Sequence, residues 1–341
     1  MKAKKRAVPL GLVILEVFLI VVFVFLSCWW YGKTYPRFYS VASEGARIPG
    51  LDTKLSPQGI CVLPENDAGY TFAMSGYISG EPSRVYLLKE NETSKTGEDT
   101  FVTFTDNGKA VKTHFGGVAC TENYLLVASG KKIIRAALSD VYAAKNGDAV
   151  EIYDSFETGL SNAFCYVYGN ELFAGEFYRP GNYETDPSHH IELEGGTNHA
   201  FIYVFPIDEA AEGGVAVKSP EKVLSVCDQV QGIVVTDDYI LLSTSYGLPD
   251  SKLYIYENKL NGEPDDSVSI LPEMSSVRPL YVLQPKKANF IMPCMSEEMC
   301  LKDGKLFILF ESMSGKYRYV VHHRITRLIS IDLNTLVDAY F

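Results

Sequence analysis

One pattern occurs five times in this chain of 341 residues. A short apolar strand opens on a small or polar residue, and a second apolar strand follows about ten residues later. The five openings are Gln58-Gly59-Ile60, Gly116-Gly117-Val118, Asn162-Ala163-Phe164, Gln231-Gly232-Ile233 and Glu297-Glu298-Met299, and the following strands begin at Tyr70, Tyr124, Leu172, Tyr239 and Leu306. Strand-rich repeats of this length are the signature of a radial β-architecture.

Each repeat carries further strand candidates. Third strands are expected at residues 84–88, 132–137, 200–205, 252–256 and 327–331, and fourth strands at 100–104, 149–153, 222–226 and 280–284. Four antiparallel strands per repeat make a propeller blade. The fifth repeat lacks its fourth strand, and residues 37–42 can supply it and close the ring. The prediction is an all-β, five-bladed β-propeller. Uneven spacing between the openings leaves six blades as the alternative.

The N-terminus has a different composition. Lys2, Lys4, Lys5 and Arg6 precede an apolar run from Val8 to Trp30, long enough to cross a hydrocarbon core as a helix. Basic residues stay on the cytoplasmic side, which places the rest of the chain outside the cell. The expected organisation is a cytoplasmic stub at 1–7, a transmembrane signal anchor at 8–30, a linker at 31–35 and an extracellular propeller at 36–341. The predicted location is the cell membrane, with a single pass.

The net charge of the chain limits the class of partner that it can bind. The chain has a formal net charge of −11, and its positive first residues leave the remainder still more acidic. Such a surface lacks the basic footprint that nucleic acid requires.

Cys61, Cys165 and Cys300 share one repeat position and Cys120 lies one step later, which indicates core packing. Cys227 and Cys294 are the one pair considered for a disulfide.

The first strand of a propeller blade lines the central channel, and the loops at one end share a face. We therefore expect a ligand site at the channel mouth, because loops on a rigid scaffold commonly carry binding. The openings and the loops after the second strands supply the predicted ligand-binding residues: Gln58, Asn162, Tyr178, Arg179, Gln231, Tyr246, Tyr317 and Arg318. Calcium is the possible cofactor, because it takes several oxygen ligands, and Asn162, Glu297 and Glu298 are its candidate ligands. The alternative is that these polar side chains cap strand ends.

Three side chains are candidates for catalysis. Glu176 and Glu311 end the second strands of the third and fifth repeats, so they could pair across the channel as an acid and a base. His114 stands at the second opening and is a candidate general base. In each case a structural role is the alternative. His189, His190 and His199, in or beside a long polar loop, are weighed as zinc ligands against a solvated loop.

The amino-acid sequence of several strands resembles that of exported bacterial β-propeller proteins of unsettled function. The residues that carry this resemblance are Thr113–Ala119, Gln231-Gly232-Ile233, Met295–Glu298, Phe310-Glu311-Ser312 and Lys316-Tyr317-Arg318. More distantly, the chain is similar to lactonase and gluconolactonase-type propellers. That similarity implies a channel calcium held by Glu297 or Glu298 and by Asn162, although the Asp of that pattern has no counterpart here.

Two functions follow as expectations. The first is a membrane-tethered extracellular module that recognises a glycan, peptide or protein partner through its loop face. The second is a calcium-assisted hydrolase with its site at the channel mouth. Propeller folds host both classes, so the fold alone does not decide between them.

Overall fold

The computed structural model describes residues 10–31, 34–90, 99–270 and 276–339, and these divide into two compact units, Met1–Arg37 and Phe38–Phe341. The first unit contains helix α1 (Leu10–Tyr31). In the described ranges no helix combines the length and hydropathy needed for a membrane span. Residues 1–9 of the predicted stub and anchor, and residues 32–33 of the linker, lie outside the described residues. The transmembrane anchor therefore stays a prediction.

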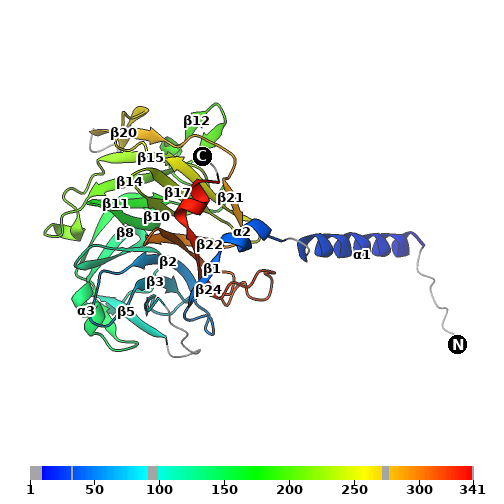
Figure 1. Ribbon diagram of the computed structural model, residues 1–341, viewed down its shortest axis with the longest axis horizontal. Helices are drawn as coiled ribbons and strands as arrows, with labels where there is room; N and C mark the ends of the chain where they lie inside the picture. The colour runs from blue at the N-terminus through cyan, green and yellow to red at the C-terminus, as the bar shows by residue number, and fades with distance from the viewer. Residues whose placement is uncertain (1–9, 32–33, 91–98, 271–275, 340–341) are drawn as a thin grey trace, which may run out of the picture. The chain divides into compact units, whose positions relative to one another are not determined.

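The second unit is an all-β structure (Figure 1). Its strands are β1 (Ser43–Arg47), β2 (Ser56–Val62), β3 (Phe72–Tyr77), β4 (Arg84–Leu88), β5 (Thr100–Asp106), β6 (Lys109–Ala110), β7 (Phe115–Cys120), β8 (Tyr124–Ala137), β9 (Ala149–Glu151), β10 (Asp154–Tyr168), β11 (Glu171–Glu176), β12 (Ile191–Leu193), β13 (Gly196–Asn198), β14 (Ala200–Pro206), β15 (Lys222–Val226), β16 (Val230–Val235), β17 (Tyr239–Thr244), β18 (Ser251–Glu257), β19 (Asp266–Ile270), β20 (Ser276–Val282), β21 (Phe290–Met292), β22 (Ser296–Lys302), β23 (Lys305–Phe310) and β24 (Arg327–Asp332). Helix α2 (Pro36–Val41) spans the boundary between the units, and α3 (Leu138–Ala143), α4 (Leu333–Val337) and two single 3₁₀ turns, η1 (Pro187–His189) and η2 (Glu212–Gly214), complete the elements.

The predicted strand pairs form at all five openings. Strands β2, β7, β10, β16 and β22 contain the openings, and each pairs antiparallel with the strand that follows it in the chain. These opening strands also lie beside one another in a closed circuit. Strand β2 is next to β7 and β22, β10 is next to β7 and β16, and β16 is next to β22. The openings therefore meet around a common centre.

The N-terminal part of the second unit closes one sheet, as predicted, but with different residues. Strand β1 pairs antiparallel with β24 and completes the order β1-β24-β23-β22. The predicted closing segment, residues 37–42, lies largely in helix α2 instead. Phe38 explains the difference. The centroid of its buried ring lies 6.0 Å from the ring centroid of Phe310 and 6.2 Å from that of Phe290, and this packing fixes the segment as a helical turn.

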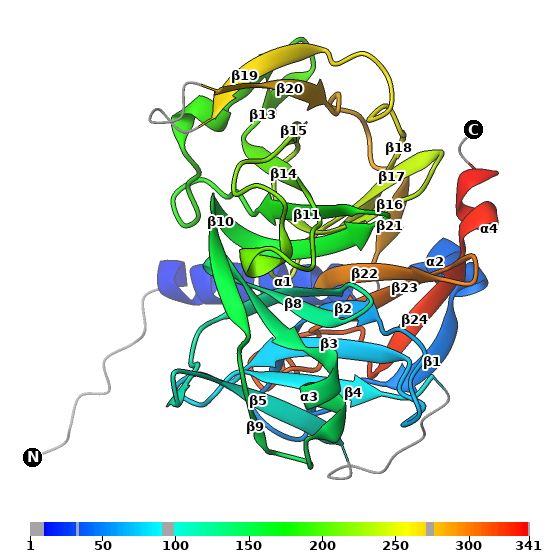
Figure 2. The same cartoon turned by 90° about the vertical axis from the view of Figure 1, so that its left-hand side faces the viewer.

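The outer strands depart from the prediction in two repeats. In the second repeat, residues 149–153 were expected to be the fourth strand, but β9 pairs in parallel with β5, and Asp154–Glu157 of β10 pairs with β8. In the fourth repeat, residues 280–284 were expected to be the fourth strand. Instead β21 pairs with β18, and β20 pairs in parallel with β15. Figure 2 shows β19 and β20 at the outer edge of the sheet that contains β14 and β15. Edge pairing depends on connections that hydrophobic alternation does not encode.

The cysteines lie in the core layers. Cys61, Cys165 and Cys300 are buried and Cys120 is partly buried, which agrees with a packing role. Cys227 and Cys294 are both free thiols, so the disulfide considered for them does not form. Burial raises the pKa of Cys61, Cys165 and Cys300, and the charge of Glu298 raises it further, so these three thiols lie near the same carboxyl group.

Candidate functional site

A local break in the strand register marks every opening. The pairing shifts between Pro57 and Gly59 and at the equivalent points of β7, β10, β16 and β22. A β-bulge leaves backbone groups without ladder partners. At or just after these shifts in β2, β7 and β10, one backbone N–H group of each strand donates to a side chain.

Glu298 is that side chain. Its buried carboxyl group accepts hydrogen bonds from the backbone N–H groups of Ile60 at 2.9 Å, Val118 at 2.9 Å and Cys165 at 3.1 Å. The three donors belong to β2, β7 and β10, so one side chain from β22 joins four of the opening strands. Burial raises the pKa of Glu298 well above its usual range, and the three N–H donors oppose that shift.

Glycines at the equivalent opening positions make room for this carboxyl group. A Cβ atom on Gly117 would overlap Oε1 of Glu298 and the backbone nitrogen of Cys165. A Cβ atom on Gly232 would lie 2.7 Å from Cα of Glu298. The small opening residues of the repeat are therefore required by the close approach of the strands to Glu298.

Beside this centre lies a cavity of about 460 Å³. Its lining includes predicted residues from several repeats: Gln58, His114, Asn162, Gln231, Tyr246, Glu297, Glu311 and Tyr317. Aromatic side chains that were not predicted as ligands, Tyr77, Phe177 and Tyr183, also line it, together with Lys316. Residues of the openings and of the loops after the second strands thus line one cavity.

Glu297 and Glu311 form a hydrogen-bonded carboxyl pair in this cavity. Glu297 is 2% exposed. Burial raises the pKa of Glu297 well above 4.5, and Glu311 and Glu298 raise it further. Burial also raises the pKa of Glu311, to about 8, although the Lys316 ammonium and the hydrogen bond from Glu297 lower it. The pair therefore keeps its protons at neutral pH, and this part of the cavity wall is uncharged there.

His114 is at the rim of the cavity. Its Nε2 lies 2.6 Å from Oε1 of Gln58, and its ring centroid lies 4.0 Å from that of Tyr77. Desolvation of the ring, and then the charge of Lys316, lower the pKa of His114 below 6.5. The imidazole is therefore neutral at pH 7. Lys316 affects both His114 and Glu311, so the three groups share one electrostatic environment.

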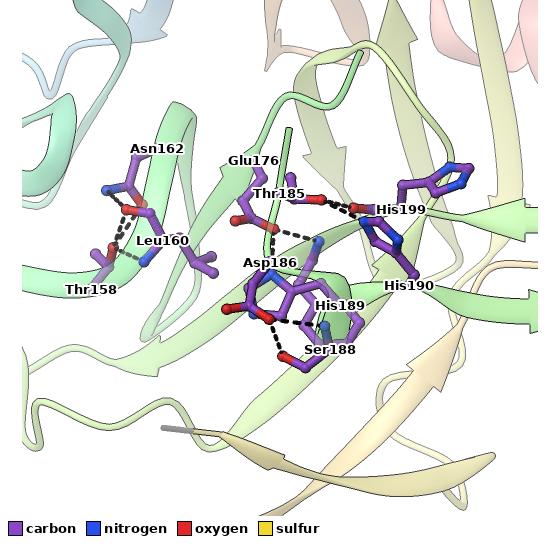
Figure 3. Close-up of polar contacts among 11 residues, drawn as sticks. Thr158, Leu160, Asn162, Glu176, Thr185, Asp186, Ser188, His189, His190 and His199 are labelled. Atoms are coloured by element: carbon purple, nitrogen blue, oxygen red, sulfur yellow. Dashed lines mark hydrogen bonds and ion pairs between the residues drawn. The ribbon is translucent and has the colours of Figure 1, made fainter. Parts of the chain in front are cut away.

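Glu176 and Glu311 do not form the expected pair across the channel. Glu311 has Glu297 as its partner, whereas Glu176 is buried, with Oε2 2.9 Å from Nδ1 of His189 and accepting from the backbone N–H of Phe201 at 3.1 Å (Figure 3). The same strand position thus carries a cavity residue in one repeat and a loop anchor in the other. The sequence gives no signal for this difference, because it depends on the fold of the long loop after β11.

That loop is held by its histidines. Nδ1 of His199 lies 2.8 Å from Oδ1 of Asp228, and the His199 ring stacks on Tyr178 with centroids 4.3 Å apart. Nε2 of His190 lies 3.2 Å from the hydroxyl of Thr185 (Figure 3). The histidines weighed as zinc ligands therefore have protein partners, and Thr185, which sequence reasoning missed, lines the cavity.

Three other predicted residues act around the cavity rather than in its lining. Tyr178 is buried against the loop histidines. The guanidinium of Arg179 lies 4.0 Å from the ring centroid of Tyr246 and orients a lining residue. Arg318 donates to the backbone carbonyls of Leu51 at 2.6 Å and Thr53 at 2.7 Å, so it fixes the loop that carries Tyr317.

The candidate calcium ligands are largely engaged by protein donors. Both oxygens of Glu298 accept backbone N–H groups, and Oδ1 of Asn162 accepts from the Thr158 hydroxyl at 3.0 Å (Figure 3). Across the described ranges, no three His, Cys, Asp or Glu side chains are grouped to hold a metal ion. This donor set does not fit a calcium site made of Asn162, Glu297 and Glu298.

Comparisons with known proteins place the chain only coarsely. No protein-family model matches it, and its sequence matches no curated protein. Similar solved structures include glutaminyl cyclase from Myxococcus xanthus, 9% identical over 85% of this chain and 95% of that chain, with a TM-score of 0.43. The PQQ-bound aldose sugar dehydrogenase from Streptomyces coelicolor is 12% identical over 86% of this chain and 97% of that chain, also with a TM-score of 0.43. The WD40 β-propeller domain of Doa1 is 12% identical over 85% of this chain and 96% of that chain, with a TM-score of 0.36. At these values the similarities carry no argument about the activity of this chain.

Proposed function

We propose that residues 38–341 form a five-bladed β-propeller that recognises a small, uncharged polar ligand of the carbohydrate class in the cavity at its channel mouth. Strands β2, β7, β10, β16 and β22 are the innermost strands of the five blades in this proposal. Their closed circuit of contacts and their shared bulges support this blade number.

The composition of the cavity wall is the observation that carries the ligand class. Tyr77, Phe177, Tyr183, Tyr246 and Tyr317 offer aromatic faces, and Gln58, Asn162, Gln231 and Ser245 offer hydrogen-bonding groups. Sugars combine an apolar face with hydroxyl groups, so they suit a pocket of this kind. Since the Glu297–Glu311 pair is protonated at neutral pH, it can donate as well as accept hydrogen bonds without attracting a cation.

A carbohydrate-binding screen on the full-length protein tests this proposal. For each carbohydrate that binds, calorimetry measures the affinity of the unmutated protein and of two variants. Tyr246→Ala removes one aromatic side chain of the cavity wall, and Tyr319→Ala is the matched control. Tyr319 is 83% exposed and does not line the cavity. We expect Tyr246→Ala to weaken binding at least about 10-fold, the loss of one good aromatic contact, and Tyr319→Ala to leave it unchanged. Preferential binding of peptides, or equal effects of the two substitutions, would contradict the carbohydrate assignment at this cavity.

We also propose that residues 8–30 tether the propeller to the cell membrane, with the propeller outside the cell. The basic cluster before an apolar run supports this orientation. Protease added to intact cells should then digest residues 36–341 while the N-terminus stays protected. Recovery of the whole chain in the soluble fraction, or its full protection in intact cells, would contradict the proposal.

A further inference from the structure

The Glu297–Glu311 pair differs from the other polar groups of the cavity because both members are acids, with Glu297 buried and Glu311 partly exposed. Glu297 comes from the bulge at the start of β22, and Glu311 follows the end of β23, so the two carboxyl groups are brought together by one hairpin. Among the described residues that line the cavity, the one Lys or Arg side chain is Lys316, and it acts on Glu311 rather than Glu297. A structural carboxyl pair has no need of a cavity, whereas this pair faces one of about 460 Å³.

The spacing of the pair limits the chemistry it can perform. Glycosidases that use two carboxyl groups keep them about 5 Å or more apart, to leave room for the sugar carbon and for water. Two hydrogen-bonded carboxyl groups are closer than that. The arrangement instead matches a dyad that shares a proton, in which one carboxylate activates water and the other carboxylic acid binds a carbonyl oxygen.

We propose that Glu297 and Glu311 are an acid–base dyad that hydrolyses a small ester or amide, namely an acyl group carried by the neutral polar ligand of the cavity. This inference rests on the proposed ligand site. Glu311 is the base, because Lys316 favours its ionised form and Glu297 donates a hydrogen bond to it. Glu297 is the acid, because it is the more buried of the two and lacks a cationic neighbour among the groups that act on it.

Each step balances in atoms and protons. Glu311 takes a proton from water as the water oxygen bonds to the acyl carbon, and Glu297 gives its proton to the carbonyl oxygen. The tetrahedral intermediate then returns that proton to Glu297 and re-forms the carbonyl. The bond to the leaving oxygen or nitrogen breaks, and that atom takes the proton held by Glu311. The products are a carboxylic acid and an alcohol or amine, and no oxidant is consumed.

The groups around the dyad set its pH dependence. Glu298 raises the pKa of Glu297, Lys316 lowers that of Glu311, and Tyr77 and Tyr317 are phenols in the same electrostatic environment. Hydrolysis requires one ionised and one protonated carboxyl group. Activity should therefore rise as the pH approaches 8, where Glu311 ionises, and fall again where Glu297 ionises.

The test measures acetate release by the full-length protein from p-nitrophenyl acetate and from O-acetylated and N-acetylated glucose derivatives. Binding of the same sugars is measured in parallel by calorimetry. We expect Glu311→Gln and Glu297→Gln to lower kcat/KM about 100-fold or more with little change in affinity, and the double variant to be no worse than either single variant. Glu263→Gln is the control, because Glu263 is exposed and outside the cavity lining. The pH profile of the unmutated protein keeps the test valid if a variant fails to fold.

The outcomes separate the two proposals. Sugar binding without acetate release from any of these compounds, or unchanged rates in both glutamine variants, would overturn the dyad and leave the ligand site standing. Absence of both binding and hydrolysis would overturn the two proposals together. A rate independent of pH between 6 and about 9 would contradict the dyad even if hydrolysis occurred, since the ionisation of Glu311 lies in that range.

Discussion

Glu298 accepts a hydrogen bond of 2.9 Å from the backbone N–H of Val118, a residue 180 positions earlier in the chain. The same carboxyl group binds two further strands, so it connects the beginning, middle and end of the second unit at one point. Each donor lies at or one residue after the register shift of its strand, and the space for the carboxyl group is open because the neighbouring openings carry glycine. This arrangement gives the cavity a rigid base.

Removal of this carboxyl group should strongly destabilise the fold. Glu298→Ala leaves three buried N–H groups without an acceptor, and we expect a loss of at least about 3 kcal/mol in the free energy of unfolding. Glu298→Gln keeps one acceptor oxygen and should lose less. Denaturant unfolding measures both, with Glu263→Ala as an exposed control expected to change stability by less than about 0.5 kcal/mol. A Glu298→Ala variant as stable as this control would mean that the three bonds do not hold the strands.

Gly117 should not tolerate a side chain. Gly117→Ala places a methyl group on the Glu298 carboxyl and the Cys165 backbone, and we expect a loss of about 1–3 kcal/mol from overpacking. Gly262→Ala is the matched control, because the closest atom to its added Cβ is the Lys259 carbonyl oxygen at 3.4 Å. Thermal unfolding of the two variants provides the comparison. Equal midpoints would show that the centre has more room than the structure describes.

Stability should depend on pH through the carboxyl pair. Because the folded pKa of Glu311 lies near 8 and its ordinary value is 4.5, the folded state holds more protons than the unfolded state between these values. The associated stability is fully present below pH 4.5 and is lost as the pH rises through about 8. Glu311→Gln cannot ionise, so its unfolding free energy should vary less between pH 5 and about 9. Parallel profiles for the variant and the unmutated protein would contradict this assignment.

Calcium should not stabilise the protein through the channel. A tightly bound ion would raise the unfolding temperature by mass action as its concentration increases. Because the oxygens of Glu298 and Oδ1 of Asn162 already accept protein hydrogen bonds, we expect no shift on titration with calcium after treatment with a chelator. A saturable upward shift that Asn162→Ala abolishes would favour the calcium-assisted hydrolase instead.

The parts of the fold that repeat were predictable from the sequence, and the parts that occur once were not. The opening strand and its partner recur five times because each must bury an apolar face and approach the same centre, and this leaves a pattern of glycine and apolar residues. The outer strands β9, β20 and β21 do not approach that centre, so their pairing leaves no repeated pattern in the sequence. The closing strand β1 lies later in the chain than predicted, because the buried side chain of Phe38 anchors helix α2, which precedes β1.

The candidate site was predictable in place but not in its interactions. Gln58, Asn162, Gln231 and Glu297 line the cavity because their strand positions are equivalent. Two adjacent glutamates nevertheless have opposite roles, since Glu298 enters the centre and Glu297 faces the cavity beside Glu311. Successive side chains of a strand point to opposite faces, so alternation separates the two glutamates, but the register shift between Ser296 and Met299 prevents alternation from telling which of them faces the cavity. Tyr183 and Thr185 were missed because the long loop after β11 folds back over the cavity through its histidine contacts.

The pH dependence of ligand affinity tests the central claim most directly, because the claim is that a protonated carboxyl pair makes the cavity suited to an uncharged polar ligand. Affinity of the best sugar for the full-length protein should be constant below pH 7 and should weaken above about pH 8, as Glu311 ionises. Glu311→Gln should bind the same sugar with an affinity that no longer changes over this range. Affinity that strengthens above pH 8, or that changes equally in the variant, would contradict the account.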